Sequence, residues 1–590
     1  MFPPRLSHGR MAFGRKLSRH GLPVLVLGSL SLAMALIGGT PFYHPDFITG
    51  KARHAVLNFG NPDFFHYPAL GLYLNGALYG AYEIVLRTLP SAWSSALKIW
   101  PYSDMPGHLL TASFSVMGAL STYGTGYLLT RSREYGFLGG LLLITSPLWN
   151  AGAHFLTVDI PLAALCALTL YVSVRFAETT RDIGRPHALV LGILVGLAAS
   201  VKYNGAIIVS SAAAVLGLRT RPFLHSVRWF ALCGISALVT FALLNPFILI
   251  DSPAFVRDFM LEMNHAATGH PGYTADPFHY HLSTSLYYGW GWMLALLSGW
   301  GTVLILIDRR LNPTTAWAVL LFPILHLSLL LGSKLAFQRY ALPLIPFVAV
   351  LASYGVFGIR RHGNNHLAPL PRRIMGAVSL AMLAAALAVH GIQSVNHNLL
   401  LQRTDTRAVF RKAFSANKSG LRSLQIAAGR YSGDHLGVPV DVFPGHGSSQ
   451  TLRDLDILIM DSFSHDRYIY DKRLTLFVDF SRFTEGLVVT LTPYDQKKDR
   501  VPFSPESLYS PYFPDSAFRL RPGPYIEVYF SDASLARSFS DSLSLSGVGN
   551  ASGPVTLGYY YNKFSRTTPR RGGSRGPPWI DRVSDSLKWG

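Results

Sequence analysis

Two carboxylates and two cations stand out in this sequence because each directly follows or precedes an apolar segment. Asp46 comes after the first such segment, Asp159 before another, and Lys202 and Arg339 follow two more. A carboxylate at the water-facing end of a membrane helix can act as a general base. A lysine can neutralise a phosphate as a point charge, and an arginine can bind one with its planar fork of donors. Together they suit deprotonation of a hydroxyl beside an anionic lipid headgroup.

Each of these residues also has a purely structural interpretation. Asp46 could cap a helix in solvent, and Asp159, with Pro161 two residues later, could simply begin one. Lys202 and Arg339 could extend apolar stems to the membrane surface. Ionisable groups at membrane depth are costly, however, and by default suggest a site with partners. The chemical interpretation therefore rests on the set rather than on any single member.

Further polar and aromatic residues lie beside the same apolar segments and are predicted to contact substrate. They are His66, Tyr67, His154, Tyr203, Asn204, His265, His270 and Lys334. The pair His265 and His270 could suggest a metal, but two histidines alone fall short of the three or four protein ligands that a zinc site uses. We therefore predict no metal site and no cofactor, although the residues do not forbid a divalent ion.

The elements that carry these residues are predicted to be membrane helices. The chain has 590 residues, of which 49% are hydrophobic and only 14% charged, against about a quarter charged in ordinary soluble domains. Apolar segments near the spanning length of about 20 residues predict about eleven transmembrane helices. These segments are 21–42, 109–130, 137–153, 160–177, 188–201, 206–218, 229–250, 286–307, 315–331, 340–358 and 374–394.

The net charge of +20 is explained by membrane topology, and nucleic acid is not an expected partner. Arginine and lysine concentrate in alternate connections, beginning with residues 1–20, and this asymmetry predicts a cytoplasmic N-terminus. Had the segment 68–89 also crossed the membrane, the later arginine-rich connections would lie outside. We therefore expect 68–89 to be an interfacial or re-entrant helix within one outer loop, 43–107.

The C-terminal part differs in composition from the rest and follows the last apolar segment, which places it on the outer side. A helix is predicted around 406–414, and short strands at 456–460, 474–480, 487–492 and 525–530, separated by turn residues. Residues 395–562 are thus predicted to form a small extracytoplasmic α/β domain after a transmembrane domain at 21–394. Residues 563–590 are basic and rich in Gly, Pro and Ser, and are predicted to be disordered.

The order of these motifs resembles a known family. Asp46, the motifs 65–70, 154–161, 200–204 and 339–343, and a weaker echo at 404–407 are similar to bacterial membrane glycosyltransferases of the GT-C superfamily. These are relatives of protein O-mannosyltransferases and of lipid A aminoarabinose transferase. The resemblance covers residues 43–358. It implies an α-helical polytopic fold with two interfacial helices in the first outer loop.

The resemblance also implies an activity. Such enzymes, of hexosyl- or pentosyltransferase type, take a sugar from a polyprenyl-phosphate carrier and need no nucleotide sugar. Asp46 would be the catalytic base for a glycan, lipid or protein hydroxyl, with inversion at the sugar carbon. Asp159 would be a second acidic residue, and Lys202 would contact the carrier phosphate. The expected location is the bacterial inner membrane, with the active site on the extracytoplasmic face.

Two other functions compete with this one. The family usually shows Asp followed by Glu, whereas Phe47 follows Asp46 here, which is compatible with a catalytically inactive membrane scaffold on the same fold. A lipid or small-molecule transporter would be expected to show paired repeats and polar groups near the bilayer midplane. Neither is evident in this sequence.

Overall fold

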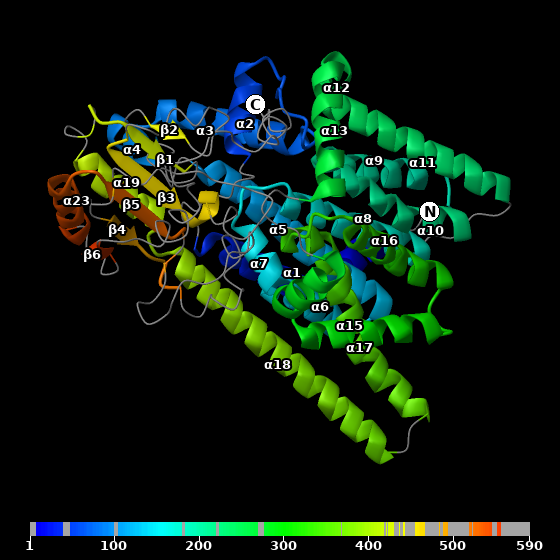
Figure 1. Cartoon of the computed structure of the whole chain (residues 1–590). Coiled ribbons are helices and arrows are strands. Elements are labelled where there is room, and N and C mark those ends of the chain that lie inside the picture. The colour runs from blue at the N-terminus through cyan, green and yellow to red at the C-terminus, as the bar shows by residue number, and fades with distance from the viewer. Residues whose placement is uncertain are drawn as a thin grey trace, which may run out of the picture. The chain divides into compact units, whose positions relative to one another are not determined.

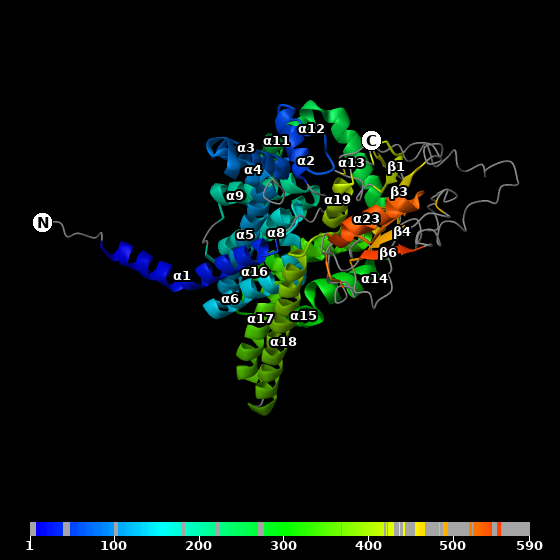
Figure 2. The same cartoon turned by 90° about the vertical axis from the view of Figure 1, so that its left-hand side faces the viewer.

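The computed structural model divides the chain into two compact units (Figures 1 and 2). Unit 1 comprises Met1–Gly269 and Ala275–Leu399, and unit 2 comprises His270–Thr274 and Leu400–Gly590. The structure describes residues 7–38, 48–98, 104–179, 183–219, 223–269, 276–366, 369–417, 421, 423–429, 436, 440–442, 455–465, 483, 488–493, 519–521, 523–545 and 551–555.

Unit 1 is a bundle of helices, and the described part of every predicted apolar segment lies largely in helical structure. The first half contains α1 (Ser7–Leu36), α2 (Thr49–Leu57), α3 (Leu70–Thr88), α4 (Ser91–Lys98), α5 (Met105–Thr130), α6 (Arg133–Thr145), α7 (Pro147–Ala153), α8 (Asp159–Thr179), α9 (Arg185–Val201), η2 (Tyr203–Ile208) and α10 (Val209–Leu218). The second half contains α11 (Phe223–Leu244), α12 (Phe247–Ile250), α13 (Ser252–Thr268), α14 (Pro277–Tyr280), η3 (His281–Trp290), α15 (Trp292–Ile307), α16 (Pro313–Gly332), η4 (Gln338–Leu344), α17 (Ile345–His366) and α18 (Pro369–Leu401).

Several of these helices have the length and composition of membrane spans. Among the described residues five stretches qualify, or six if the bent pair 277–287 and 292–307 is one span. They are Asp159–Glu178, Leu224–Leu244, Pro313–Gly332, Gln338–Ile359 and a stretch that begins at Ile374. Others are shorter because they are interrupted: Pro147 follows the end of α6, and η2 separates α9 from α10. Eleven spans therefore stay a prediction.

The first long connection holds three helices, α2, α3 and α4, where the resemblance implied two. One face of α3 is buried, at Leu72, Asn75, Tyr79 and Leu86, a spacing of three, four and seven residues that keeps them on one side of a helix. In both views α2, α12 and α13 lie at the end of unit 1 opposite the lower ends of α17 and α18 (Figures 1 and 2).

Glycines allow a close helix contact in the bundle core, between α15 and α17. A Cβ at Gly301 would lie 1.9 Å from the carbonyl oxygen of Leu351, and one at Gly355 would lie 2.5 Å from that of Leu297. Such distances are far inside van der Waals contact, so a side chain at either position would force the two helices apart. Small residues at helix contacts are common in membranes because they let backbones approach closely.

Unit 2 contains a mixed sheet of six strands in the order β2-β1-β3-β5-β4-β6. The strands are β1 (Ile426–Ala428), β2 (Asp441–Val442), β3 (Ile457–Asp461), β4 (Val488–Leu491), β5 (Ile526–Phe530) and β6 (Ala551–Val555). β1 pairs in parallel with β2 and β3, and the other pairs are antiparallel. The sheet shares a hydrophobic core with α19 (Thr406–Ala416) and α23 (Ala533–Leu545).

The positions of these elements can be compared with the predicted ones. α19 falls on the predicted helix, and β3, β4 and β5 fall on three of the four predicted strands. The fourth, 474–480, and the basic segment 563–590 lie outside the described residues. Alternate strand residues such as Ile457 and Ile459 face the core, as the two-residue period of a strand requires.

Candidate active site

Asp159 and Lys202 form a largely buried ion pair in unit 1. Asp159 is the first residue of α8, and Lys202 follows α9 with an extended backbone before η2 begins. The Lys202 Nζ donates to Asp159 Oδ1 at 2.8 Å, and the two side chains are 14% and 5% exposed. The chain can turn this tightly because residue 205 is glycine: a Cβ there would lie 2.3 Å from the Ala198 carbonyl oxygen.

Arg339, at the start of η4, joins the pair from the other side of the carboxylate. Its Nε lies 3.9 Å from Asp159 Oδ2, and its side chain is 15% exposed. Its guanidinium lies over the ring of Phe337 at 4.3 Å and over that of Tyr340 at 5.2 Å. Two cations thus converge on one carboxylate in a sparsely hydrated place.

Aromatic rings complete the surroundings of the lysine. Lys202 Nζ lies 4.3 Å from the ring centre of Tyr340 and 5.6 Å from that of Tyr67, both within the range of cation–π attraction. The cluster of Asp159, Lys202, Arg339, Tyr67 and Tyr340 is called the cation cluster below. Its charge and donors suit a phosphate, which would receive charge-assisted hydrogen bonds from both cations.

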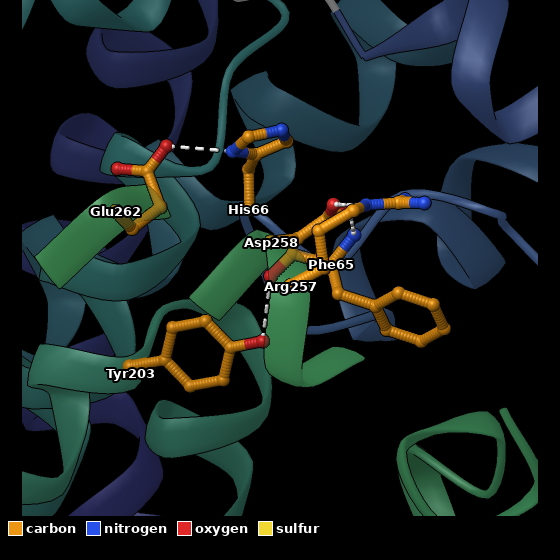
Figure 3. A network of polar contacts seen from close by, with 6 residues as sticks. All are labelled: Phe65, His66, Tyr203, Arg257, Asp258 and Glu262. Carbon is orange, nitrogen blue, oxygen red and sulfur yellow. Dashed lines mark hydrogen bonds and ion pairs between the residues drawn. The ribbon is translucent and has the colours of Figure 1, made fainter. Parts of the chain in front are cut away.

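Tyr67 belongs to an irregular segment, residues 61–69, which is called the strap below. Figure 3 shows how α13 holds its middle. The Phe65 N–H donates to Asp258 Oδ2 at 2.9 Å, and His66 Nδ1 lies 2.8 Å from Glu262 Oε1. On the other side the Tyr203 hydroxyl donates to the Phe65 carbonyl oxygen at 2.8 Å. Two predicted site residues, His66 and Tyr203, therefore meet in this network.

Sequence reasoning missed the acidic residues of α13. Asp258 is buried and accepts a further hydrogen bond from the neighbouring Arg257 at 2.8 Å. This bond raises the pKa of the Arg257 guanidinium. The usable signal was spacing: Asp251, Asp258 and Glu262 follow one another after seven and four residues, which places three carboxylates on one face of a helix.

The other predicted residues lie elsewhere or are less constrained. His154 is buried, with Nδ1 2.7 Å from the carbonyl oxygen of Asn150 and Nε2 3.0 Å from that of Ile37. Asn204 lies in η2, and its buried Oδ1 has no hydrogen-bond partner within the described part of the chain. Both ring nitrogens of His154 therefore contact backbone carbonyl oxygens of the bundle, whereas the Asn204 side-chain oxygen can still accept a hydrogen bond.

His265 lies near the end of α13, and Lys334 lies just after the end of α16, close to the same turn of α13. His265 is in the last turn of α13, and the Lys334 N–H donates to the carbonyl oxygen of Ala266 at 3.0 Å. Asp46 and His270 lie outside the described residues. Within the described ranges, no group of three or more His, Cys, Asp or Glu side chains is arranged to hold a metal ion.

Comparisons with known proteins bear on this arrangement. Residues 96–245 match the family model described as dolichyl-phosphate-mannose-protein mannosyltransferase. ArnT from Cupriavidus metallidurans, crystallised with undecaprenyl phosphate, superimposes with a TM-score of 0.50 at 15% identity, covering 70% of this chain and 83% of that one. The chain has the GT-C fold. The fold recognised from the motifs is thereby confirmed.

A second solved structure with the GT-C fold covers more of the chain. The apo oligosaccharyltransferase of Archaeoglobus fulgidus superimposes with a TM-score of 0.50 at 11% identity, over 80% of this chain and 73% of that one. No curated protein sequence matches significantly. The family match includes Asp159 and Lys202 but neither the strap nor Arg339, so those parts of the site rest on the geometry described above.

Proposed function

We propose that this protein is an integral membrane glycosyltransferase that transfers a sugar from a polyprenyl-phosphate carrier to an acceptor hydroxyl. The observation that carries the proposal is the convergence of two cations, Lys202 and Arg339, on Asp159 with little exposure to water. Such a place favours an anion with several acceptor oxygens. A lipid phosphate has this chemistry, and the ArnT structure contains one, undecaprenyl phosphate.

In this proposal the cations stabilise the leaving group. The donor phosphate binds Lys202 and Arg339, whose charge is in place before the sugar–phosphate bond breaks. Asp159 holds both cations and does not touch the anion. The rings of Tyr67 and Tyr340 reduce the water around Lys202, which strengthens its attraction for the phosphate.

Asp46 is proposed as the general base, although it lies outside the described residues. It takes the proton of the acceptor hydroxyl while that oxygen forms a bond to the sugar C1. The bond from C1 to the phosphate oxygen breaks on the opposite side, and the carrier leaves as a lipid phosphate. A single displacement of this kind inverts the configuration at C1.

The proposed location is the outer face of the bacterial inner membrane, with a cytoplasmic N-terminus. Arg361 lies near the C-terminal end of α17 and Arg372 near the N-terminal end of α18, and the positive-inside rule makes these helix ends cytoplasmic. These helix ends and α13, which holds the strap, lie at opposite ends of unit 1 (Figure 1). The arrangement supports an outward-facing strap.

Asp46→Asn tests the proposal. The change is nearly isosteric and removes the base, so turnover of purified enzyme should fall by about 10² to 10⁴, while the protein still inserts and folds. Lipid-linked sugars and surface glycans of a deletion strain, measured by mass spectrometry, identify the donor and product. Asp276→Asn is a matched control, because Asp276 is an exposed helix cap and its loss should leave turnover unchanged.

Two results would contradict the proposal in different ways. Wild-type turnover in Asp46→Asn would remove Asp46 from the mechanism and leave the donor site standing. Unchanged lipid-linked sugars and glycans in the deletion strain would instead favour the inactive scaffold that Phe47 allows.

A further inference from the structure

The strap is held to α13 by three carboxylates in succession. Asn61 Nδ2 donates to Asp251 Oδ2 at 3.1 Å, the Phe65 N–H donates to Asp258, and His66 pairs with Glu262. Asp251 is the N-cap of α13, and Asp258 and Glu262 follow it after seven and four residues on one face of the helix. A segment without regular structure must find partners for its backbone groups, and here one helix face supplies them.

Asp258 is the most constrained of the three carboxylates. It is 4% exposed, and both of its oxygens are used: Oδ2 accepts from the Phe65 N–H and Oδ1 from Arg257 Nε. A carboxylate buried this deeply is tolerated only with such partners. The bond to Phe65 therefore fixes the strap backbone at one point, and the Tyr203 hydroxyl fixes the same residue from its carbonyl oxygen.

The anchored backbone leads directly to the cation cluster. Tyr67 is two residues after Phe65, and its ring lies 5.6 Å from Lys202 Nζ. Two residues after Tyr67, the Ala69 N–H donates to Asn245 Oδ1 at 2.6 Å. Tyr67 is thus set between two fixed backbone positions, and Asp258 supplies one of them.

The far end of α13 contacts the chain shortly before Arg339. The Ala266 carbonyl oxygen accepts from the Lys334 N–H at 3.0 Å, five residues before Arg339. One helix therefore holds the segment that presents Tyr67 and borders the segment that presents Arg339.

We propose that Asp258 is a positioning residue for the donor site, which sets the Tyr67 ring beside the Lys202 ammonium through its bond to the Phe65 N–H. This inference rests on the proposed binding of a carrier phosphate at Lys202. Asp258 does not touch the donor, and its effect on donor affinity passes through the strap.

A double-mutant cycle tests this route, with undecaprenyl phosphate titrated into purified full-length protein in detergent. Asp258→Ala should weaken binding about tenfold, the equivalent of about 1.4 kcal/mol. In a Tyr67→Leu background the same change should alter the dissociation constant by less than about twofold, because the ring that Asp258 positions is already gone. Additive effects would show that Asp258 does not act through Tyr67.

Two further variants separate positioning from folding. Asp258→Asn keeps an oxygen that can accept from Phe65, so it should restore affinity to within about twofold of wild type. Arg257→Gln removes the other partner of Asp258 while the hydrogen bond from the Phe65 N–H to Asp258 stays possible, and it should leave affinity unchanged. If Asp258→Asn binds as weakly as Asp258→Ala, or Arg257→Gln weakens binding equally, the hydrogen bond to Phe65 is not the cause.

Lys202→Met distinguishes failure of this inference from failure of the donor site itself. Unchanged binding of undecaprenyl phosphate by Lys202→Met would refute the proposed donor site. Weakened binding by Lys202→Met together with wild-type binding by Asp258→Ala would refute the positioning role alone.

Discussion

Neutralising Lys202 should separate its role in stability from its role in donor binding. In Lys202→Met the apolar stem is kept, but Asp159, 5% exposed, loses a partner at 2.8 Å and retains Arg339 at 3.9 Å. Breaking a buried ion pair by removing one partner costs about 3–5 kcal/mol. Because Lys202 keeps some exposure and Arg339 remains, we expect a loss of about 2–3 kcal/mol in the free energy of unfolding.

The double variant Lys202→Met with Asp159→Asn removes the carboxylate that has lost its partner at 2.8 Å, but it also removes the counter-charge of Arg339. It should therefore recover only part of the lost stability, seen as the apparent Tm of purified protein in detergent. Donor affinity should not recover, because the lysine is still absent. Loss of one charged hydrogen bond is worth about 1.5–3 kcal/mol, so undecaprenyl phosphate should bind about 10- to 150-fold more weakly to both variants.

Arg339→Met should weaken donor binding to a similar degree, about 1.5–3 kcal/mol, with a smaller loss of stability, because its contact with Asp159 is longer. An unchanged Tm in Lys202→Met would mean that the ion pair of Lys202 with Asp159 does not stabilise the folded protein. Wild-type affinity in the double variant would mean that the cation cluster does not bind the phosphate. Either result refutes the reasoning.

Three further predictions concern topology and packing. A cysteine that replaces Arg310 should react only with membrane-permeant reagents, and a cysteine that replaces Ser91 should also react with impermeant reagents added outside, as the charge asymmetry requires. If the cysteine at position 91 reacted only with permeant reagents, the proposed orientation would be wrong. Gly301→Leu should prevent α15 from approaching α17 and lower the Tm and yield of folded protein, because its Cβ would meet the Leu351 carbonyl oxygen. Glu527→Gln should destabilise unit 2 by about 1–3 kcal/mol, measured by thermal unfolding or limited proteolysis, because this buried carboxylate accepts from two tyrosine hydroxyls at 2.7 and 2.6 Å.

The membrane bundle was largely predictable because length and apolarity are local properties. Segments such as 315–331 and 374–394 lie within α16 and α18. The strands around Ile457 and Ile526 were predictable from short β-branched runs between turn residues. Interruptions were harder to predict, because the break between α9 and α10 depends on how closely residue 205 approaches Ala198.

The sequence was enough to name most residues of the candidate site, but not to predict which of them contact one another. The sequence suggests that Lys202 requires an anion, and a carrier phosphate is one candidate. The structure shows that Asp159, forty-three residues earlier, already supplies one. Asp258 and Glu262 contact residues more than 190 positions away, and local pattern carries no information about such distant partners.

The interruption of α9 and α10 at Lys202 also bears on how the protein is made. α9 has 17 residues and α10 has 10, so neither reaches the roughly 20 apolar residues that let a helix enter a bilayer independently. Asp159 is synthesised before Lys202, and Arg339 comes last. Since N-terminal parts generally fold first during synthesis, each cation would arrive at a membrane that already contains its counter-ion. The shared carboxylate would then serve biogenesis before it serves catalysis.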